Sequence, residues 1–301
     1  MKGWLPSFFY SNWFYGCCVV ALSIEASLQQ GFALNRSIYY VALFCATVVY
    51  YTYAYRNDKG YAPNNERSRW YASHKKLVLT YQVQFSLMGG LCGIFLLFEY
   101  GEQVLQMNLA ECCLAAIFPM LALGYYGTLQ FGGKRFNLRN LGLLKPFIIG
   151  FIWAGVVTIY PLLFNAIETG QHYAPDTMGW LFFLKNFVFI SILCILFDIK
   201  DYAADHNAAL KTFVVRFGLR KTLFWVIMPM TVLGFAAFLR FTIYRQLGWE
   251  RMLINSIPFV MLIIVSWSMH RRKSILYYLA IIDGLMLLKA ACGIIGMKFL
   301  N

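Results

Sequence analysis

The sequence predicts an all-α protein that crosses a membrane with nine helices. Composition is the first reason: 60% of the 301 residues are hydrophobic and only 13% are charged, whereas a soluble domain carries about 25% charged residues. The second reason is a series of long apolar segments separated by polar loops. Because a helix needs about 20 apolar residues to cross the bilayer, each long segment is a candidate transmembrane helix.

Nine segments meet this requirement, in chain order. They cover residues 9–29, 38–55, 77–98, 109–127, 143–164, 179–197, 222–241, 252–270 and 275–299. The second and sixth are the clearest, and only a short basic turn separates the last two. The sequence contains no linker and no second soluble domain, so we expect residues 1–301 to form a single transmembrane domain.

Basic residues are concentrated in alternate loops. Lys and Arg cluster after the second, fourth, sixth and eighth segments, whereas the loops after the third and fifth segments are richer in acids. Because loops rich in Lys and Arg stay on the cytoplasmic side, we expect a cytoplasmic N-terminus and a C-terminus outside. The loop after the seventh segment departs from this pattern. The net charge of +13 therefore indicates membrane orientation rather than nucleic-acid binding.

Three aspartates follow the sixth apolar segment, in the stretch FDIKDYAADHNAALKTFVVRFGL at 197–219. The spacing of Asp198, Asp201 and Asp205 puts all three within about 60° of one helix face. They also lie where a membrane helix ends. The C-terminal end of a helix carries partial negative charge, so three acids there need a positive group to compensate them. One interpretation is a carboxylate cluster that holds Mg²⁺ and, through it, a phosphate-bearing ligand. The other is a solvated loop whose acids pair with nearby Lys and Arg, namely Lys200, Lys211, Arg216 and Arg220.

This stretch resembles the second aspartate-rich motif of the UbiA superfamily of intramembrane prenyltransferases. The residues that match are Asp198, Lys200, Asp201, Asp205, Lys211, Thr212 and Gly218. The nine-segment layout is similar to the nine helices of that family. The loop after the fourth segment, YYGTLQFGGKRFNLRNLGLLKPF, resembles a family segment in which a tyrosine precedes a basic pair, here Tyr126, Lys134 and Arg135.

The first motif of the family, NDxxDxxxD, is only partly matched. The corresponding run after the second segment is RNDKGYAPNNERSRW, in which Asn57 and Asp58 match. Tyr61 and Asn65 stand where two further aspartates are expected. The run carries Lys59, Arg67 and Arg69 instead, so we hypothesise that these cations take over charge neutralisation.

The resemblance implies a fold, an activity and a site. The helices would surround a central cavity, and the protein would move a prenyl group from an isoprenoid diphosphate to a lipophilic acceptor, often an aromatic ring. Mg²⁺ and basic side chains would stabilise the departing diphosphate, and aromatic faces the carbocation. The implied catalytic and metal-binding residues are Asp58, Asp198, Asp201 and Asp205. The diphosphate-binding residues, including the hypothesised Arg67, are Asn57, Arg67, Tyr126, Lys134, Arg135 and Lys211.

Two other functions stay open. A pseudoenzyme of the same fold would bind an isoprenoid or a membrane lipid without ionising diphosphate, and its second-motif acids would be paired with Lys or Arg. An enzyme should instead bring Asp58 within reach of those acids. A transporter, the least favoured alternative, should carry polar residues at mid-membrane depth. Glu25, Asp283 and Lys289 lie within apolar segments, where they either form ion pairs or hydrogen bonds between helices of the bundle or contact the acceptor.

Overall fold

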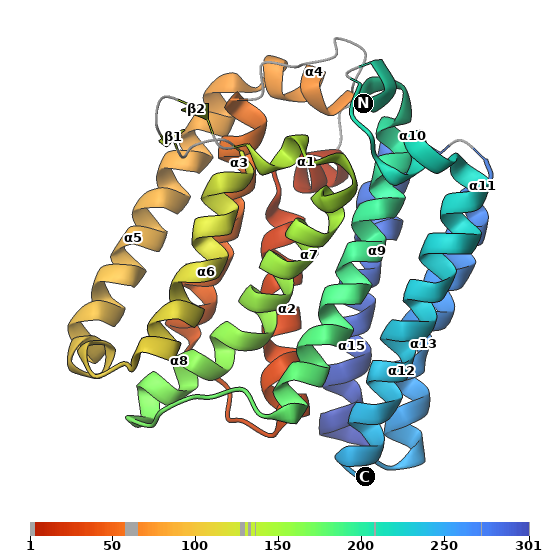
Figure 1. Cartoon of the computed structure of the whole chain (residues 1–301). Helices are drawn as coiled ribbons and strands as arrows, with labels where there is room; N and C mark the ends of the chain where they lie inside the picture. Colours follow the sequence, from red (N-terminus) through yellow and green to blue (C-terminus); the bar gives the residue numbers. More distant parts are fainter. Residues whose placement is uncertain are drawn as a thin grey trace.

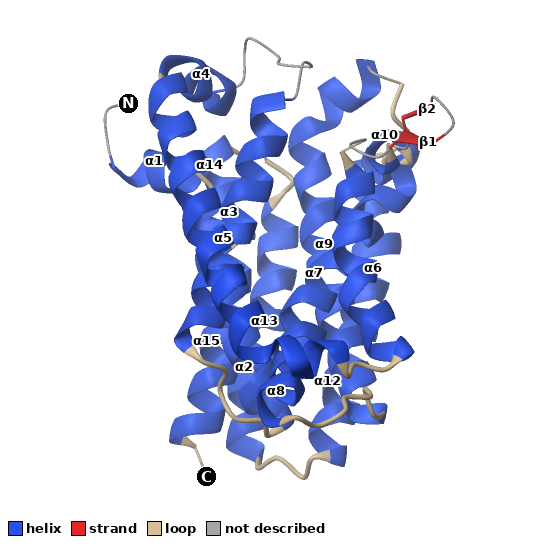
Figure 2. Ribbon diagram, turned by 90° about the vertical axis from the view of Figure 1, so that its left-hand side faces the viewer, coloured by secondary structure: helices blue, strands red, loops and turns tan. Residues whose placement is uncertain are grey.

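The computed structural model describes residues 4–57, 66–126, 130–131, 134–135, 137–207, 209–271 and 273–300. The described chain is a bundle of long, roughly parallel helices (Figures 1 and 2). Within these described residues, seven helical segments are long and apolar enough to cross a membrane: Ser37–Arg56, Lys75–Leu105, Gly142–Thr169, Thr177–Asn207, Leu219–Tyr244, Trp249–Ser268 and Ile275–Phe299. The predicted class, an all-helical multi-pass membrane protein, is therefore confirmed.

The helices follow one another with short connections. The α-helices are α1 (Trp4–Tyr10), α2 (Trp13–Gln30), α3 (Ser37–Asn57), α4 (Glu66–Ser73), α5 (Lys75–Leu105), α6 (Leu109–Tyr125), α7 (Lys145–Ala154), α8 (Tyr160–Thr169), α9 (Thr177–Asn207), α10 (Phe213–Phe217), α11 (Leu219–Lys221), α12 (Met228–Tyr244), α13 (Trp249–Ser268), α14 (Ile275–Tyr277) and α15 (Gly284–Phe299). Three π-helical turns join consecutive helices: η3 (Gly155–Ile159), η4 (Thr222–Ile227) and η5 (Tyr278–Ile282). Two 3₁₀ turns, η1 (Leu138–Asn140) and η2 (Gly142–Leu144), precede α7. A two-residue hairpin, β1 (Gln130–Phe131) with β2 (Lys134–Arg135), is the sole strand pairing in the described part.

Helices α2 and α6 correspond to the two predicted spans that are missing from the seven. Helix α2 has 18 residues and includes Glu25, Gln29 and Gln30, all buried. It packs against α3, α15 and η3, so protein rather than lipid surrounds its polar side chains. Helix α6 is apolar but has only 17 residues. All nine predicted segments are thus helical, while the count of nine membrane crossings stays a prediction.

Helix α9 is the most buried of the seven long helices and α5 the least. About 67% of the most apolar window of α9 is buried, against 6% for α5. Helix α9 packs closely on α7 because Gly150 has no side chain, and a Cβ there would overlap Ser191 of α9. Helix α5 lies at the edge of the bundle (Figure 1) and exposes large apolar residues such as Phe98. A helix that is apolar all round and mostly buried belongs to the interior of a membrane bundle, whereas α5 has the surface that lipid would cover.

The first and last described helices point to opposite ends of the bundle. Helix α1 sits at the end that carries α4 and α10, and α15 ends at the other (Figure 1). An odd number of crossings produces this arrangement. The ends of α3 and α6, the start of α7 and the end of α9 lie at the same end of the bundle as α4 and α10 (Figure 1).

Candidate functional site

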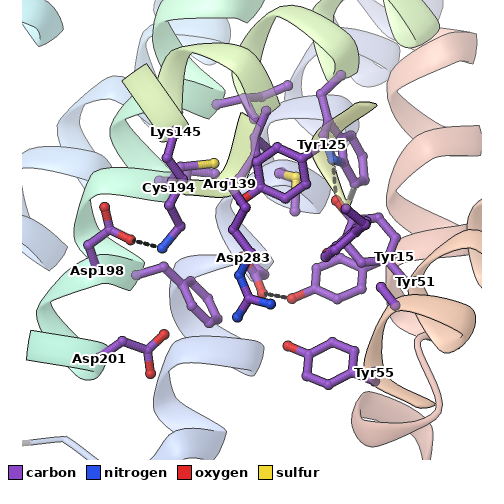
Figure 3. A pocket seen from close by; sticks show the side chains of 18 residues that line it. Tyr15, Tyr51, Tyr55, Tyr125, Arg139, Lys145, Cys194, Asp198, Asp201 and Asp283 are labelled. Carbon is purple, nitrogen blue, oxygen red and sulfur yellow. Dashed lines mark hydrogen bonds and ion pairs between the residues drawn. The ribbon is translucent and has the colours of Figure 1, made fainter. Parts of the chain in front are cut away.

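A pocket with a volume of about 180 Å³ opens at this end of the bundle. Figure 3 shows its side chains, which come from α2, α3, α6, α7, α9 and α15 and from the loop before α7. The pocket combines aspartates, cations and several aromatic rings. Its lining residues are Tyr15, Tyr51, Ala54, Tyr55, Tyr125, Tyr126, Arg139, Lys145, Ile149, Trp153, Ile190, Leu193, Cys194, Phe197, Asp198, Asp201, Asp283 and Met286.

One side of the pocket holds a buried ion pair between α7 and α9. Lys145, the first residue of α7, donates from Nζ to Asp198 Oδ1 at 2.6 Å. The close packing of α7 on α9 brings the two residues together. Only 3% of the Asp198 side chain is exposed, and its Oδ2 has no hydrogen-bond partner among the described residues. Among the described residues, Asp198 therefore has one lysine contact and one buried carboxylate oxygen without a hydrogen-bond partner.

Away from this ion pair, the pocket also holds Asp283, a carboxylate with a different partner (Figure 3). Asp283 is the residue between η5 and α15, and the hydroxyl of Tyr15 donates to its Oδ2 at 2.7 Å (Figure 3). Tyr15 stacks on Tyr51 with the ring centroids 4.8 Å apart. Trp153 donates from Nε1 to the Tyr51 hydroxyl at 2.6 Å. These bonds fix an aromatic wall that joins α2, α3 and α7 beside Asp283.

An apolar chamber adjoins the polar pocket. It has a volume of about 240 Å³ and lies between α3, α6, α7 and η3. Its lining is aromatic and aliphatic: Val19, Leu43, Ala46, Thr47, Tyr50, Tyr51, Phe118, Pro119, Ala122, Tyr125, Tyr126, Ile149, Ile152, Trp153, Val156 and Tyr160. Tyr51, Tyr125, Tyr126, Ile149 and Trp153 line both spaces. The polar pocket and the apolar chamber thus lie side by side and share an aromatic wall, and the lining of the chamber suits hydrocarbon.

The second aspartate motif lies on α9, which continues as a helix past the apolar segment. Asp198 and Asp201 both line the pocket, one turn apart. Asp205 lies two turns beyond Asp198, outside the pocket lining, and its buried Oδ2 has no hydrogen-bond partner among the described residues. The predicted common helix for the three aspartates is therefore present, but the pocket includes two of them.

The described carboxylates do not by themselves form a divalent-cation site. Within the described ranges, no three His, Cys, Asp or Glu side chains converge on a point where a metal ion would fit. Asp198 pairs with Lys145, and Asp201 Oδ1 lies 2.9 Å from Lys200 Nζ. Hard divalent cations take six or more oxygen ligands, and a lysine that occupies a carboxylate oxygen competes with them. Asp58, the remaining predicted ligand, lies outside the described residues, so Mg²⁺ binding stays a prediction.

The predicted diphosphate-binding residues have different locations. Tyr126 lines both spaces. Lys211 is exposed and is not among the pocket residues. The side chains of Asn57, at the end of α3, and of Lys134 and Arg135, in β2, lie outside what the structure describes.

Arg67 lies behind the pocket rather than in it. It is 2% exposed, contacts the side-chain oxygen of Asn12, and donates to the Tyr55 hydroxyl at 3.0 Å. Asn12 also donates to the Tyr71 hydroxyl at 2.9 Å, and burial raises the pKa of this Tyr71 phenol. The network ties α4 to the start of α2. Since Tyr55 lines the pocket, Arg67 supports its wall.

Sequence reasoning missed several residues of the pocket. Lys145 and Arg139 carry basic charge in the loop after the fourth segment, but the motif comparison did not select them. Lys145 had a usable signal, because it directly precedes an apolar segment, where a charge is costly unless it has a partner. Tyr15 and Trp153 had none, since aromatic residues are common throughout this chain.

A second polar cluster lies deep in the bundle, near the end of α2. Lys289 donates to both carboxylate oxygens of Glu25, at 2.9 and 2.6 Å. Lys185 donates to Gln29 at 2.9 Å and lies 3.5 Å from Glu25, and Gln29 donates to Asn255 at 2.7 Å. Of the two interpretations for charged residues within spans, Glu25 and Lys289 follow the first, pairing inside the bundle.

Searches for similar proteins returned no matching family model, no matching curated protein and no matching solved structure. The likeness to intramembrane prenyltransferases rests on the motif residues quoted above.

Proposed function

We propose that this protein is a UbiA-like intramembrane prenyltransferase. It binds an isoprenoid diphosphate with the diphosphate in the polar pocket and the prenyl chain in the apolar chamber, and transfers the prenyl group to a lipophilic acceptor. The observation that carries the proposal is that the polar pocket and the apolar chamber lie side by side and share one aromatic wall. A ligand with a charged head and a hydrocarbon tail fits such a pair of spaces.

Cations at the polar end would receive the diphosphate. Lys145 and Arg139 both line the pocket, and guanidinium and ammonium groups bind phosphate oxygens through charge-assisted hydrogen bonds. As the bond between the prenyl carbon and the diphosphate breaks, negative charge grows on the leaving oxygen. Donors already fixed beside that oxygen stabilise it without reorganisation. Lys145 is held by Asp198 and is therefore positioned before the ligand arrives.

The aromatic wall would stabilise the prenyl cation that remains when the diphosphate leaves. Tyr51 and Trp153 line both spaces and are joined by a hydrogen bond. They therefore lie where a ligand passes from its charged head to its hydrocarbon chain. Aromatic faces attract positive charge, and the attraction is larger where water is excluded. This side of the pocket suits the allylic cation that forms when diphosphate departs.

The membrane arrangement follows from the predicted topology. With α2 and α6 counted, the chain crosses nine times. The basic loops, the N-terminus and the polar mouth of the pocket would then face the cytoplasm, with the C-terminus outside. A water-soluble acidic head group would enter from that side, and the hydrocarbon chain from the membrane. Binding of Mg²⁺ by Asp58, Asp198, Asp201 and Asp205 stays a prediction.

A second candidate is a lipid-binding protein of the same fold that does not ionise its ligand. The ion pairs of Asp198 with Lys145 and of Asp201 with Lys200 favour it, because they neutralise acids that would otherwise hold a metal. Such a protein would use the same two spaces for binding alone. The two candidates differ in turnover, not in where the ligand sits.

Binding and turnover of a prenyl diphosphate separate the candidates. Purified protein in lipid nanodiscs is titrated with farnesyl thiolodiphosphate, in which sulfur replaces the bridging oxygen, with Mg²⁺ and with EDTA. Release of diphosphate from farnesyl diphosphate is then followed with a panel of phenols as acceptors. Binding with acceptor-dependent release supports the enzyme, and binding without release with any phenol supports the second candidate. Failure of the analogue to bind contradicts both.

A further inference from the structure

Asp283 is a buried carboxylate whose contact in the pocket is uncharged. It is 5% exposed and accepts a hydrogen bond from the Tyr15 hydroxyl. Among the described residues, no Lys or Arg forms an ion pair with it, whereas the equally buried Asp198 and Glu25 contact lysines. An acid buried in a membrane protein without a cation is costly and is by default a candidate for contact with a ligand.

The position of Asp283 strengthens this interpretation. It follows the π-helical turn η5 directly, and such turns inside α-helices occur frequently at functional sites. Its side chain lines the polar pocket beside the stacked rings of Tyr15 and Tyr51 (Figure 3). Tyr15 occupies Oδ2, which fixes the orientation of the carboxylate and leaves Oδ1 for another donor.

We propose that Asp283 binds the hydroxyl group of an aromatic acceptor and takes the proton that the acceptor loses during transfer. This assignment rests on the proposed function. The acceptor carbon forms a bond to the first prenyl carbon, and the bond from that carbon to diphosphate breaks. Its electron pair leaves with the diphosphate, and the displaced proton passes to the carboxylate of Asp283.

Asp283 and the ion pair of Lys145 with Asp198 lie apart in the pocket (Figure 3). A carboxylate repels diphosphate, so Asp283 is unsuited to the head of the donor. Lys145, from α7, stands with Asp198 away from Asp283 (Figure 3). The stacked pair of Tyr15 and Tyr51 offers aromatic faces to an aromatic acceptor, since rings pack on one another with centroids about 4.5–7 Å apart. The acceptor would therefore lie between Asp283 and the donor.

The test compares two probes that differ by one methyl group. 1-Naphthol carries a hydroxyl that donates to a carboxylate, and 1-methoxynaphthalene has the same rings without a donor. We expect wild-type protein to bind 1-naphthol at least fivefold more tightly than its methyl ether, both with and without farnesyl thiolodiphosphate. In Asp283→Leu, which has a similar size and no acceptor, the preference should fall below twofold while farnesyl thiolodiphosphate binds as before. Glu102→Gln, which removes an exposed carboxylate, should leave both affinities unchanged.

A second variant covers the case in which Asp283→Leu does not fold. Asp283→Asn keeps the shape and a weaker acceptor, so the naphthol preference should fall at least threefold without a change in farnesyl thiolodiphosphate affinity. A preference that survives in both variants, or is missing in wild type, overturns the assignment. Loss of the naphthol preference together with equal loss of donor affinity overturns it as well. If wild type shows the preference but never binds the donor analogue, the proposed function fails and the hydroxyl site stands.

Discussion

At the scale of single residues, the contact between Lys145 and Asp198 is a buried ion pair in the lining of the pocket. Both side chains are largely buried and their charged atoms are 2.6 Å apart. Removing water from two ions costs several kcal/mol per ion, which their attraction offsets only while both are present. Each residue therefore depends on the other, and changing one affects stability more than changing both.

We expect Asp198→Leu alone or Lys145→Met alone to destabilise the protein by about 3–5 kcal/mol, because each leaves an uncompensated buried charge. The double variant should be more stable than either single variant. The order of stability of the three variants is measured by thermal unfolding in detergent, followed by size-exclusion chromatography of the protein that remains folded. Lys221→Met, which removes an exposed lysine, serves as the control and should leave the midpoint unchanged. Additive losses in the double variant would show that the pair is not coupled.

The aspartates on α9 could be placed from the sequence, whereas their lysine partner could not. The spacing of Asp198, Asp201 and Asp205 depends only on helical periodicity, and α9 does carry all three. The approach of Lys145 to Asp198 depends instead on how α7 packs on α9, through the absence of a side chain at Gly150. Contacts between segments that are distant along the chain follow from packing, which local patterns do not encode.

At the scale of elements, α2 is a polar helix that other helices enclose. Its Glu25 and Gln29 face Gly293 of α15, where a Cβ would overlap both side chains. The absence of a side chain at Gly293 therefore lets α15 approach α2 closely enough for Lys289 to reach Glu25. Because other helices enclose α2, it can carry Glu25, Gln29 and Gln30, and these polar residues make it less apolar than the seven helices identified as spans.

Gly293→Ala should therefore destabilise the bundle. Overpacking a filled interior costs about 1–3 kcal/mol, and here it also displaces the Glu25 carboxylate from Lys289. Gly90→Ala in α5 is the matched control, because a Cβ at Gly90 meets no atom within 4 Å. We expect a lower unfolding temperature for Gly293→Ala only. Equal midpoints for the two variants would contradict the close approach of α15 to α2.

The polar cluster around Glu25 predicts which of its two lysines contributes more to stability. Two lysines share one carboxylate, and Lys289 contacts both oxygens of Glu25 whereas Lys185 lies 3.5 Å from one of them. Lys185→Met should therefore destabilise the protein less than Lys289→Met, since it also removes repulsion between like charges. Unfolding midpoints of the two variants give the order. A larger loss of stability for Lys185→Met would show that Lys185, rather than Lys289, is the main partner of Glu25.

At the scale of the whole molecule, the sequence predicts class and layout better than it predicts membrane crossings. Hydropathy found a helix at each of nine segments because apolar runs of that length are helical in membranes. Seven of the helical segments are long and apolar enough to cross by themselves. The number of crossings depends on whether α2 and α6 also traverse the bilayer, which their neighbours rather than their own composition decide.

Reporter fusions measure the predicted orientation. With a cytoplasmic N-terminus and nine crossings, alkaline phosphatase fused after residue 301 should be active, because it folds only outside the cytoplasm. Green fluorescent protein at the same position should stay dark after export in the unfolded state. A fluorescent fusion with inactive phosphatase would place the C-terminus in the cytoplasm and contradict either the crossing number or the orientation.

The central claim is that one amphiphile occupies the polar pocket and the apolar chamber together. A farnesyl thiolodiphosphate analogue with a diazirine at the end of its chain tests this directly, when wild-type protein is irradiated and the labelled peptides are identified by mass spectrometry. We predict adducts on chamber residues of α3, α6 and α7, and loss of the adducts when excess unlabelled analogue is added. Adducts confined to the outer face of α5, or labelling that competitor does not reduce, would contradict the account.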